Sequence, residues 1–185
     1  PGTDLCAFHT GPSGPVFFGA PVKCLAPPAQ SHTMKYRNLG KSALQVSELC
    51  LGTMMFADQT ELAEARRITA HARDNGVNFI DTADVYSLGK SESMLGELLK
   101  GQRDDWVLAT KVGNKMSERP NEQQYSRPWV LRECEASLQR LGTDHVDLYY
   151  LHRDFNGMDL EEPLRAIDTL LRDGKIRYWG VSNFR

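Results

Sequence analysis

The chain has 185 residues, with 22 Lys and Arg against 24 Asp and Glu and a formal net charge of -2. This balance excludes a basic footprint for nucleic acid and a polybasic patch for an anionic membrane surface. No apolar run approaches the ~18 residues that a membrane span requires. We therefore expect a cytoplasmic protein that binds neither nucleic acid nor membrane.

The first part of the chain differs in composition from the rest. Residues 1–33 contain six of the nine prolines and only two charged residues, Asp4 and Lys23. A secretory signal would need a basic start and a continuous apolar core, which this segment lacks. We expect residues 1–33 to be a disordered or non-native tail, and residues 34–185 to form the domain.

Two short strands are predicted at the start of this domain. Residues 35–39 and 44–46 flank the turn residues Gly40, Lys41 and Ser42, which indicates a β-hairpin. Residues 49–53 form the next strand candidate, and it ends in small residues. Small residues let the backbone approach a ligand closely.

Four later segments carry apolar residues at helical spacing and end near a glycine. Glycine just past a helix is a common C-terminal signal because it adopts positive φ without strain. The predicted helices are residues 61–75, residues 92–100 with Ser91 as N-cap, a segment from Ser126 and Pro128 to Leu141, and residues 159–173; the glycines are Gly76, Gly101, Gly142 and Gly174.

Apolar runs of strand character follow these helices, and each stops at a polar residue. Because strands and helices alternate, the pattern predicts right-handed βα units and a parallel sheet. The runs are residues 77–80 before Asp81, 106–110 before Lys111, 146–151 before His152, and 176–181 before Ser182 and Asn183.

This alternation predicts an α/β fold of the (β/α)8 TIM-barrel type. Such barrels place the C-terminal ends of all strands on one face, where their active sites lie. A complete barrel takes ~250 residues, whereas this chain begins at Pro1 and stops at Arg185, directly after a strand candidate. We expect a barrel truncated after about five strands.

The residues at the predicted strand ends suit carbonyl reduction. Tyr86 follows Asp81 on the loop, and a phenol gives up its proton more easily when an ammonium such as Lys111 is close. Asp81 would pair with Lys111 and keep it charged and oriented. His152 would donate a hydrogen bond to a substrate carbonyl, so these residues predict hydride transfer from a cofactor with a proton from Tyr86.

Over residues 34–185 the sequence also resembles the aldo-keto reductase family. It is most similar to the bacterial branch related to potassium-channel β subunits. Each matching segment alone is weak, but the segments together and in this order are specific. They are residues 36–42, 51–53, 81–83 with Tyr86, 89–92, 109–111, 151–153 and 174–184.

The resemblance implies a (β/α)8 barrel that is closed at its base by the N-terminal hairpin as a cap. It also implies NADP(H) bound across the top of the barrel without a Rossmann domain, and the sequence contains no G-x-G-x-x-G. Asp81, Tyr86, Lys111 and His152 match the family's catalytic tetrad, with Tyr86 as the general acid.

The resemblance further implies which residues meet the cofactor. Ser182 and Asn183 match the pair that hydrogen-bonds the nicotinamide carboxamide, and Gly52, Thr53 and Asp81 match strand-end positions beside the cofactor. In the family, a strand-six Gln, a stacking aromatic and the phosphate-binding loop lie beyond the segment matched here. We therefore expect the 185-residue chain alone to be inactive.

Three functions remain open for these residues. The first is an NADPH-dependent reductase of small aldehydes or ketones. The second is a nucleotide-sensing regulatory subunit of the channel-β type, and the third is a non-functional piece of a coding sequence. Residues 34–185 contain no partner-binding extension, which favours the enzyme; the oligomeric state stays unknown.

Several other residues have simpler interpretations. No metal site is expected, because the four cysteines form no C-x-x-C pair and have no His at ligand spacing. Trp129 either lies near the substrate mouth or packs. We expect packing for Tyr149, Tyr150 and Trp179, and loop or turn positions for Asp84, His145 and Asp154.

Overall fold

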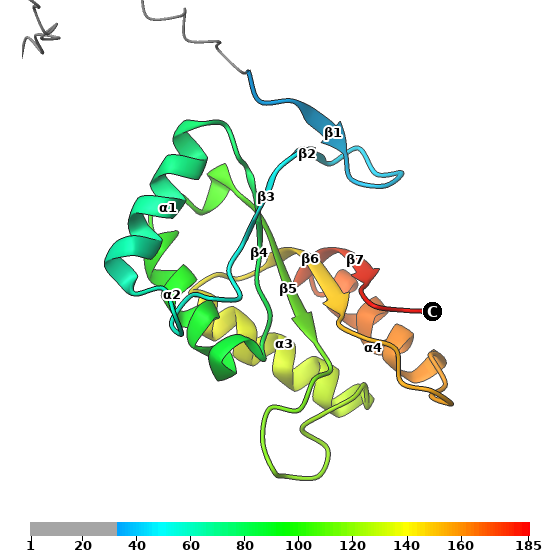
Figure 1. Ribbon diagram of the computed structural model, residues 1–185. Coiled ribbons are helices and arrows are strands. Elements are labelled where there is room, and N and C mark those ends of the chain that lie inside the picture. The colour runs from blue at the N-terminus through cyan, green and yellow to red at the C-terminus, as the bar shows by residue number, and fades with distance from the viewer. Residues whose placement is uncertain (1–32) are drawn as a thin grey trace, which may run out of the picture. The chain divides into compact units, whose positions relative to one another are not determined.

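A parallel sheet of five strands lies at the centre of residues 33–185, the part of the chain that the computed structural model describes (Figure 1). The strands are neighbours in chain order, as the predicted βα units require. The prediction for the tail falls almost wholly outside the described residues. The strands are β3 (Cys50–Gly52), β4 (Phe79–Asp81), β5 (Val107–Val112), β6 (Val146–Leu151) and β7 (Ile176–Val181).

Four α-helices of the described residues connect these strands and pack on one face of the sheet (Figure 1). In the last helix, Pro163, Ala166, Ile167 and Leu170 are buried, which is the spacing of one helical face. None of the described helices is long and apolar enough to cross a membrane. The helices are α1 (Leu62–Asp74), α2 (Lys90–Leu98), α3 (Arg127–Leu141) and α4 (Glu161–Arg172).

The predicted cap of the second helix is wrong. Helix α2 begins at Lys90, and Ser91 lies inside its first turn. The Ser91 hydroxyl is completely buried and donates to the Thr53 carbonyl at 2.9 Å. Because a buried hydroxyl must find a partner, it joins α2 to the end of β3 instead of capping the helix.

The predicted hairpin is present as β1 (Tyr36–Asn38) and β2 (Gln45–Ser47), which pair antiparallel. The backbone N–H of Ser47 donates to Asn78 Oδ1 at 2.7 Å, and the Tyr36 hydroxyl donates to the Gly76 carbonyl at 2.7 Å. Gly76 and Asn78 both precede β4. The hairpin therefore contacts the N-terminal edge of the sheet.

The aromatic residues divide into buried and exposed ones. Tyr149 is completely buried and Trp129 is 4% exposed in the hydrophobic core, so Trp129 packs. Trp179 was expected to pack as well, but it is 43% exposed. The reason is that β7 is an outer strand of the sheet, and no described element covers this part of it.

Candidate active site

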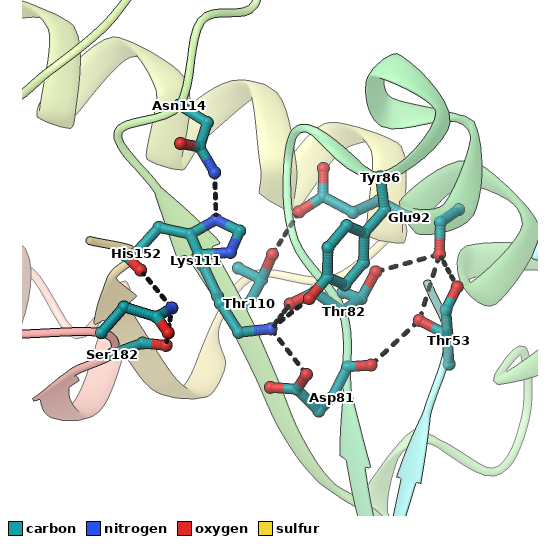
Figure 2. A network of polar contacts seen from close by, with 12 residues as sticks. Thr53, Asp81, Thr82, Tyr86, Glu92, Thr110, Lys111, Asn114, His152 and Ser182 are labelled. Atoms are coloured by element: carbon teal, nitrogen blue, oxygen red, sulfur yellow. Dashed lines mark hydrogen bonds and ion pairs between the residues drawn. The ribbon is translucent and has the colours of Figure 1, made fainter. Parts of the chain in front are cut away.

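Polar side chains from three neighbouring strands meet at the C-terminal edge of the sheet. Asp81 is the last residue of β4, Lys111 is near the end of β5, and His152 directly follows β6. Parallel pairing places Asp81 beside Ala109 and Val112 beside Leu151, which brings these strand ends together. Figure 2 shows the resulting network around Lys111.

The Lys111 ammonium is the centre of this network. Its Nζ lies 2.6 Å from Asp81 Oδ2, 2.8 Å from the Thr82 carbonyl and 3.1 Å from the Tyr86 hydroxyl. An ammonium has three donors, and these three acceptors use all of them. Lys111 is only 6% exposed, so its position is fixed by packing as well as by hydrogen bonds.

The Asp81 carboxyl group is in a mixed electrostatic environment. Burial raises its pKa above the ordinary value, while the charge of Lys111 and its hydrogen bond act in the opposite direction. A quarter of the Asp81 side chain is exposed, against 8% for Lys111. The pair is therefore open to solvent from the carboxylate side, and the ammonium points inward to Tyr86.

The His152 ring lies edge-on to the phenol of Tyr86, with 5.9 Å between the ring centroids. Burial, followed by the charges of Lys111 and Arg153, lowers the pKa of His152 to about 4. The imidazole is therefore neutral at physiological pH. The Asn114 amide nitrogen lies 3.0 Å from Nδ1, which assigns that nitrogen as the acceptor and leaves the proton on Nε2.

Tyr86 is carried by a short, constrained loop. It begins the 3-10 turn Tyr86–Gly89, in which Ser87 and Leu88 have φ values of 50° and 52°. Positive φ is unfavourable for residues with a Cβ, and it persists only where the surroundings impose it. The Ser87 hydroxyl donates to the Phe56 carbonyl at 3.2 Å, which ties the turn to the loop after β3.

The predicted cofactor residues at the end of β3 have different surroundings. Thr53 is completely buried, and its N–H and hydroxyl both donate to the Asp81 carbonyl at 3.0 Å. Its side chain thus holds β3 against β4. Gly52 is exposed, and no atom lies within 4 Å of the position that a Cβ would occupy there. Only Gly52 of these two borders open space.

Ser182 and Asn183 follow β7 at the same edge of the sheet. Asn183 has φ 56°, and its amide nitrogen donates to the His152 carbonyl at 3.2 Å and to Ser182 Oγ at 2.9 Å. Because the amide hydrogens are used in this way, Oδ1 of Asn183 remains available as an acceptor and the hydroxyl of Ser182 as a donor. These two groups fit a carboxamide, which offers a carbonyl acceptor and an NH2 group that donates.

Two hollows flank the network. One, of about 620 Å³, is lined by polar residues that include Asn114, His152 and Asn183. The other, of about 530 Å³, lies beside Tyr86 and includes the apolar side chains of Met54 and Leu88. No cluster of three or more His, Cys, Asp or Glu residues between residues 33 and 185 is arranged to hold a metal ion.

Asp84 lies in a turn, as expected, but its carboxyl group is not an ordinary solvated charge. Asp84 is completely buried behind the Tyr86 turn, and its Oδ2 has no hydrogen-bond partner among the described residues. Burial raises the pKa of this carboxyl well above its ordinary value, and the nearby Glu133 and Glu92 raise it further. Asp154 and His145 do lie in loops, as expected.

Sequence reasoning missed three residues that contact this site or its support. Asn114 holds His152, and it follows the end of β5 by two residues, so its position was a usable signal. Tyr125 accepts from the Arg153 N–H at 2.9 Å and donates to the Arg153 carbonyl at 2.6 Å. Arg140 bonds Glu92 from a helix that precedes the next strand, and no local pattern marks that contact.

The chain is similar to known proteins of one family. The family model described as "Aldo/keto reductase family" matches residues 48–185. The chain is 42% identical to the uncharacterized oxidoreductase YrpG of Bacillus subtilis, over 82% of this chain and 50% of that protein. It is 38% identical to a probable voltage-gated potassium channel subunit beta of Arabidopsis thaliana, over 82% of this chain and 47% of that one.

Solved structures give the same result. The holo form of aldo-keto reductase AKR11C1 from Bacillus halodurans matches with a TM-score of 0.75 and 40% sequence identity, over 81% of this chain and 50% of that one. The chain thus spans about half the length of the relatives it matches, and its five-stranded sheet corresponds to part of a TIM barrel. The chain belongs to the aldo/keto reductase family.

Proposed function

We propose that these residues form the catalytic half of an NADP(H)-dependent reductase that converts aldehydes or ketones to alcohols. The observation that carries the proposal is the position of the Lys111 ammonium between Asp81 and Tyr86. We refer below to the full-length form, meaning a chain in which residues 33–185 are joined to the other half of the relatives' length, which the family resemblance places after them. Activity is proposed for that form.

The proton would come from Tyr86. Its hydroxyl accepts a hydrogen bond from Lys111, and that bond stabilises the phenolate that remains after the proton has moved to the carbonyl oxygen. Asp81 balances the ammonium charge and fixes its direction. NADPH, when bound, supplies the hydride for the carbonyl carbon.

His152 would orient the carbonyl group. A neutral ring with its proton on Nε2 donates one hydrogen bond without adding a positive charge beside Lys111. A second donor next to Tyr86 stabilises the oxygen as negative charge develops on it, and such donors typically contribute a few kcal/mol to the transition state. Ser182 and Asn183 would hold the nicotinamide carboxamide.

The experiment is a turnover assay on the full-length form. Purified protein, NADPH and a small aldehyde are mixed, and loss of NADPH absorbance is followed together with alcohol formation. We expect aldehyde-dependent oxidation of NADPH in stoichiometric yield of the alcohol. Absence of alcohol with a properly folded protein that binds NADPH would reject the reductase.

One comparison favours a second candidate, a nucleotide-sensing regulatory subunit. It is the 38% identity to the Arabidopsis protein described as a probable channel subunit beta. Such a subunit would bind NADPH tightly but turn over slowly if at all. Tight binding without turnover in the same assay would favour this candidate.

A further inference from the structure

Arg140 forms a buried ion cluster behind the loop that carries Tyr86. It lies on α3, and its Nε donates to Glu92 Oε2 at 2.6 Å. Its Nη2 donates to Glu133 and, at 3.0 Å, to Ser137 Oγ. Arg140 thus binds two carboxylates and a hydroxyl at once through the rigid fork of its guanidinium group, a geometry that the flexible, point-like ammonium of Lys does not reproduce.

The cluster reaches the strand that carries Lys111. Glu92 is completely buried in the first turn of α2, and its Oε1 accepts from the Thr110 hydroxyl at 2.5 Å. Thr110 directly precedes Lys111 in β5, and alternating side chains of a strand point to opposite faces. One residue therefore faces the cluster while its neighbour faces the active site.

Arg140 also packs directly on the Tyr86 turn. A Cβ added to Gly89 would lie 2.7 Å from Arg140 Cδ and 3.0 Å from its Nε. Gly89 ends the turn and has φ 84°. Since Ser87 and Leu88 also have positive φ, the turn needs external support to keep its shape.

Arg140 is the cation that balances a group of buried acids. Glu92, Glu133 and Asp84 are each less than a twentieth exposed. Asp84 lies at the start of the loop. Its N–H donates to the Lys111 carbonyl at 3.1 Å, and its Oδ1 accepts from the Val85 N–H at 2.6 Å. Without Arg140, these buried carboxylates would have no compensating cation. The loop that they support begins at Asp84, two positions before Tyr86.

We infer that Arg140 is a positioning residue for Tyr86, which holds the loop of residues 84–90 so that the phenol stays beside Lys111. Its catalytic consequence rests on the proposed function, but the positioning itself does not. A small shift of the Tyr86 hydroxyl relative to the Lys111 ammonium would slow proton transfer. It would leave cofactor binding unchanged. Misplacements of this kind lower kcat by about tenfold to a hundredfold.

The test compares Arg140→Lys with Arg103→Lys in the full-length form. Arg103 is a matched control, because it forms a partly buried ion pair with Asp147 at 2.7 Å and bonds two backbone carbonyls near the opposite edge of the sheet. We expect both variants to lower the melting temperature. Only Arg140→Lys should lower kcat, by about tenfold or more, with KM and the Kd of NADPH within about twofold of wild type.

A second readout does not depend on activity. With 3-fluorotyrosine placed at position 86, the 19F spectrum of wild type should show one resonance. Arg140→Lys should shift, broaden or split it, whereas Arg103→Lys should not. If wild type has no reductase activity, the proposed function fails while this spectrum still decides the positioning role.

Gly89→Ala disturbs the same contact from the loop side, because it keeps every charge, pushes against Arg140 and strains the turn at φ 84°. It replaces Arg140→Lys if that variant does not fold. An unchanged 19F resonance in either variant, or an equal loss of kcat in Arg140→Lys and Arg103→Lys, would overturn the inference.

Discussion

The side-chain amide nitrogen of Asn114 lies 3.0 Å from Nδ1 of His152. An amide nitrogen can only donate, so a neutral imidazole accepts at Nδ1 and carries its proton on Nε2. The loop after β5 thereby decides which ring nitrogen can donate to a substrate. This contact joins the ends of two strands, so the pairing of these strands sets the tautomer of His152.

Asn114→Asp should therefore introduce a new pH dependence. A carboxylate beside Nδ1 favours the imidazolium and therefore raises the pKa of His152 from about 4. At a pH above this raised pKa the ring is neutral, and the carboxylate keeps the remaining proton on Nδ1. Donation from Nε2 is lost as pH rises through that value. In the full-length form, kcat/KM should fall about tenfold or more across this step.

The control for this prediction is Asn114→Gln, which keeps an amide donor. Its kcat/KM profile should stay flat over the same pH range, as in wild type. Nitrogen-15 spectra of the imidazole identify the tautomer directly. An Asn114→Asp variant with the proton still on Nε2 at high pH would contradict the prediction.

Tyr86→Phe should abolish turnover in the full-length form and leave cofactor affinity nearly unchanged. The hydroxyl that lies 3.1 Å from Lys111 acts on the transition state, so its loss should lower kcat by about a hundredfold or more. Tyr36→Phe is the control, because that hydroxyl bonds Gly76 at the opposite edge of the sheet. Kinetics and NADPH fluorescence separate kcat from Kd, and Tyr86→Phe with wild-type kcat would exclude Tyr86 as the acid.

Most of the fold could be predicted from the sequence because its signals are local. Strand β7 and helix α4 follow from apolar spacing and from Gly174, and no long-range information is needed to find them. The exception is Ser91, which reads as a cap. Its burial against Thr53 depends on where β3 lies in space, and a pattern of neighbouring residues does not contain that information.

The candidate site also has a part that the sequence predicts and a part that it does not. Asp81, Lys111 and His152 end strands, so parallel pairing alone predicts that they meet. The buried cluster of Glu92 and Arg140 could not be predicted, because it joins two helices whose facing sides are set by packing. Polar residues on these helices look like ordinary surface positions until their burial is known.

Acid should destabilise the protein through His152. Its pKa is about 4 in the folded state and 6.5 as the ordinary value, so the unfolded chain binds the proton first as pH falls. The contribution of His152 to the free energy of unfolding is fully present above pH 6.5 and is lost as pH falls towards about 4. A shift of this size corresponds to at most about 3 kcal/mol.

Urea unfolding of the full-length form at about pH 7 and about pH 5 measures this loss. His152→Gln should show a smaller loss of unfolding free energy between the two conditions than wild type. His71→Gln, at an exposed position of α1, should behave like wild type. Equal losses in all three proteins would show that His152 is not the group responsible.

The outer strand β7 should promote association of the 185-residue chain. Tyr178, Trp179 and Val181 are 36%, 43% and 47% exposed on a strand whose outer edge is unpaired among the described residues. Exposed, apolar edge strands pair with other chains. We expect low solubility, which Trp179→Lys should improve in light scattering; Lys35→Arg serves as a neutral control. A monomeric, cooperatively unfolding wild-type chain would contradict this.

The 185-residue chain should bind NADPH at best in the millimolar range and oxidise none of it. Ser182 and Asn183 offer neutral hydrogen bonds, which contribute only ~0.5 to 1.5 kcal/mol each, whereas micromolar affinity needs about 8 kcal/mol. The resemblance to the family implies that charged contacts to the phosphates come from the C-terminal half. The full-length form should therefore bind in the micromolar range and prefer NADPH to NADH. Fluorescence titration of both proteins decides the matter, with Asn183→Leu as the variant that removes the amide group at this position. Micromolar binding by residues 1–185 would show that the nucleotide site lies elsewhere.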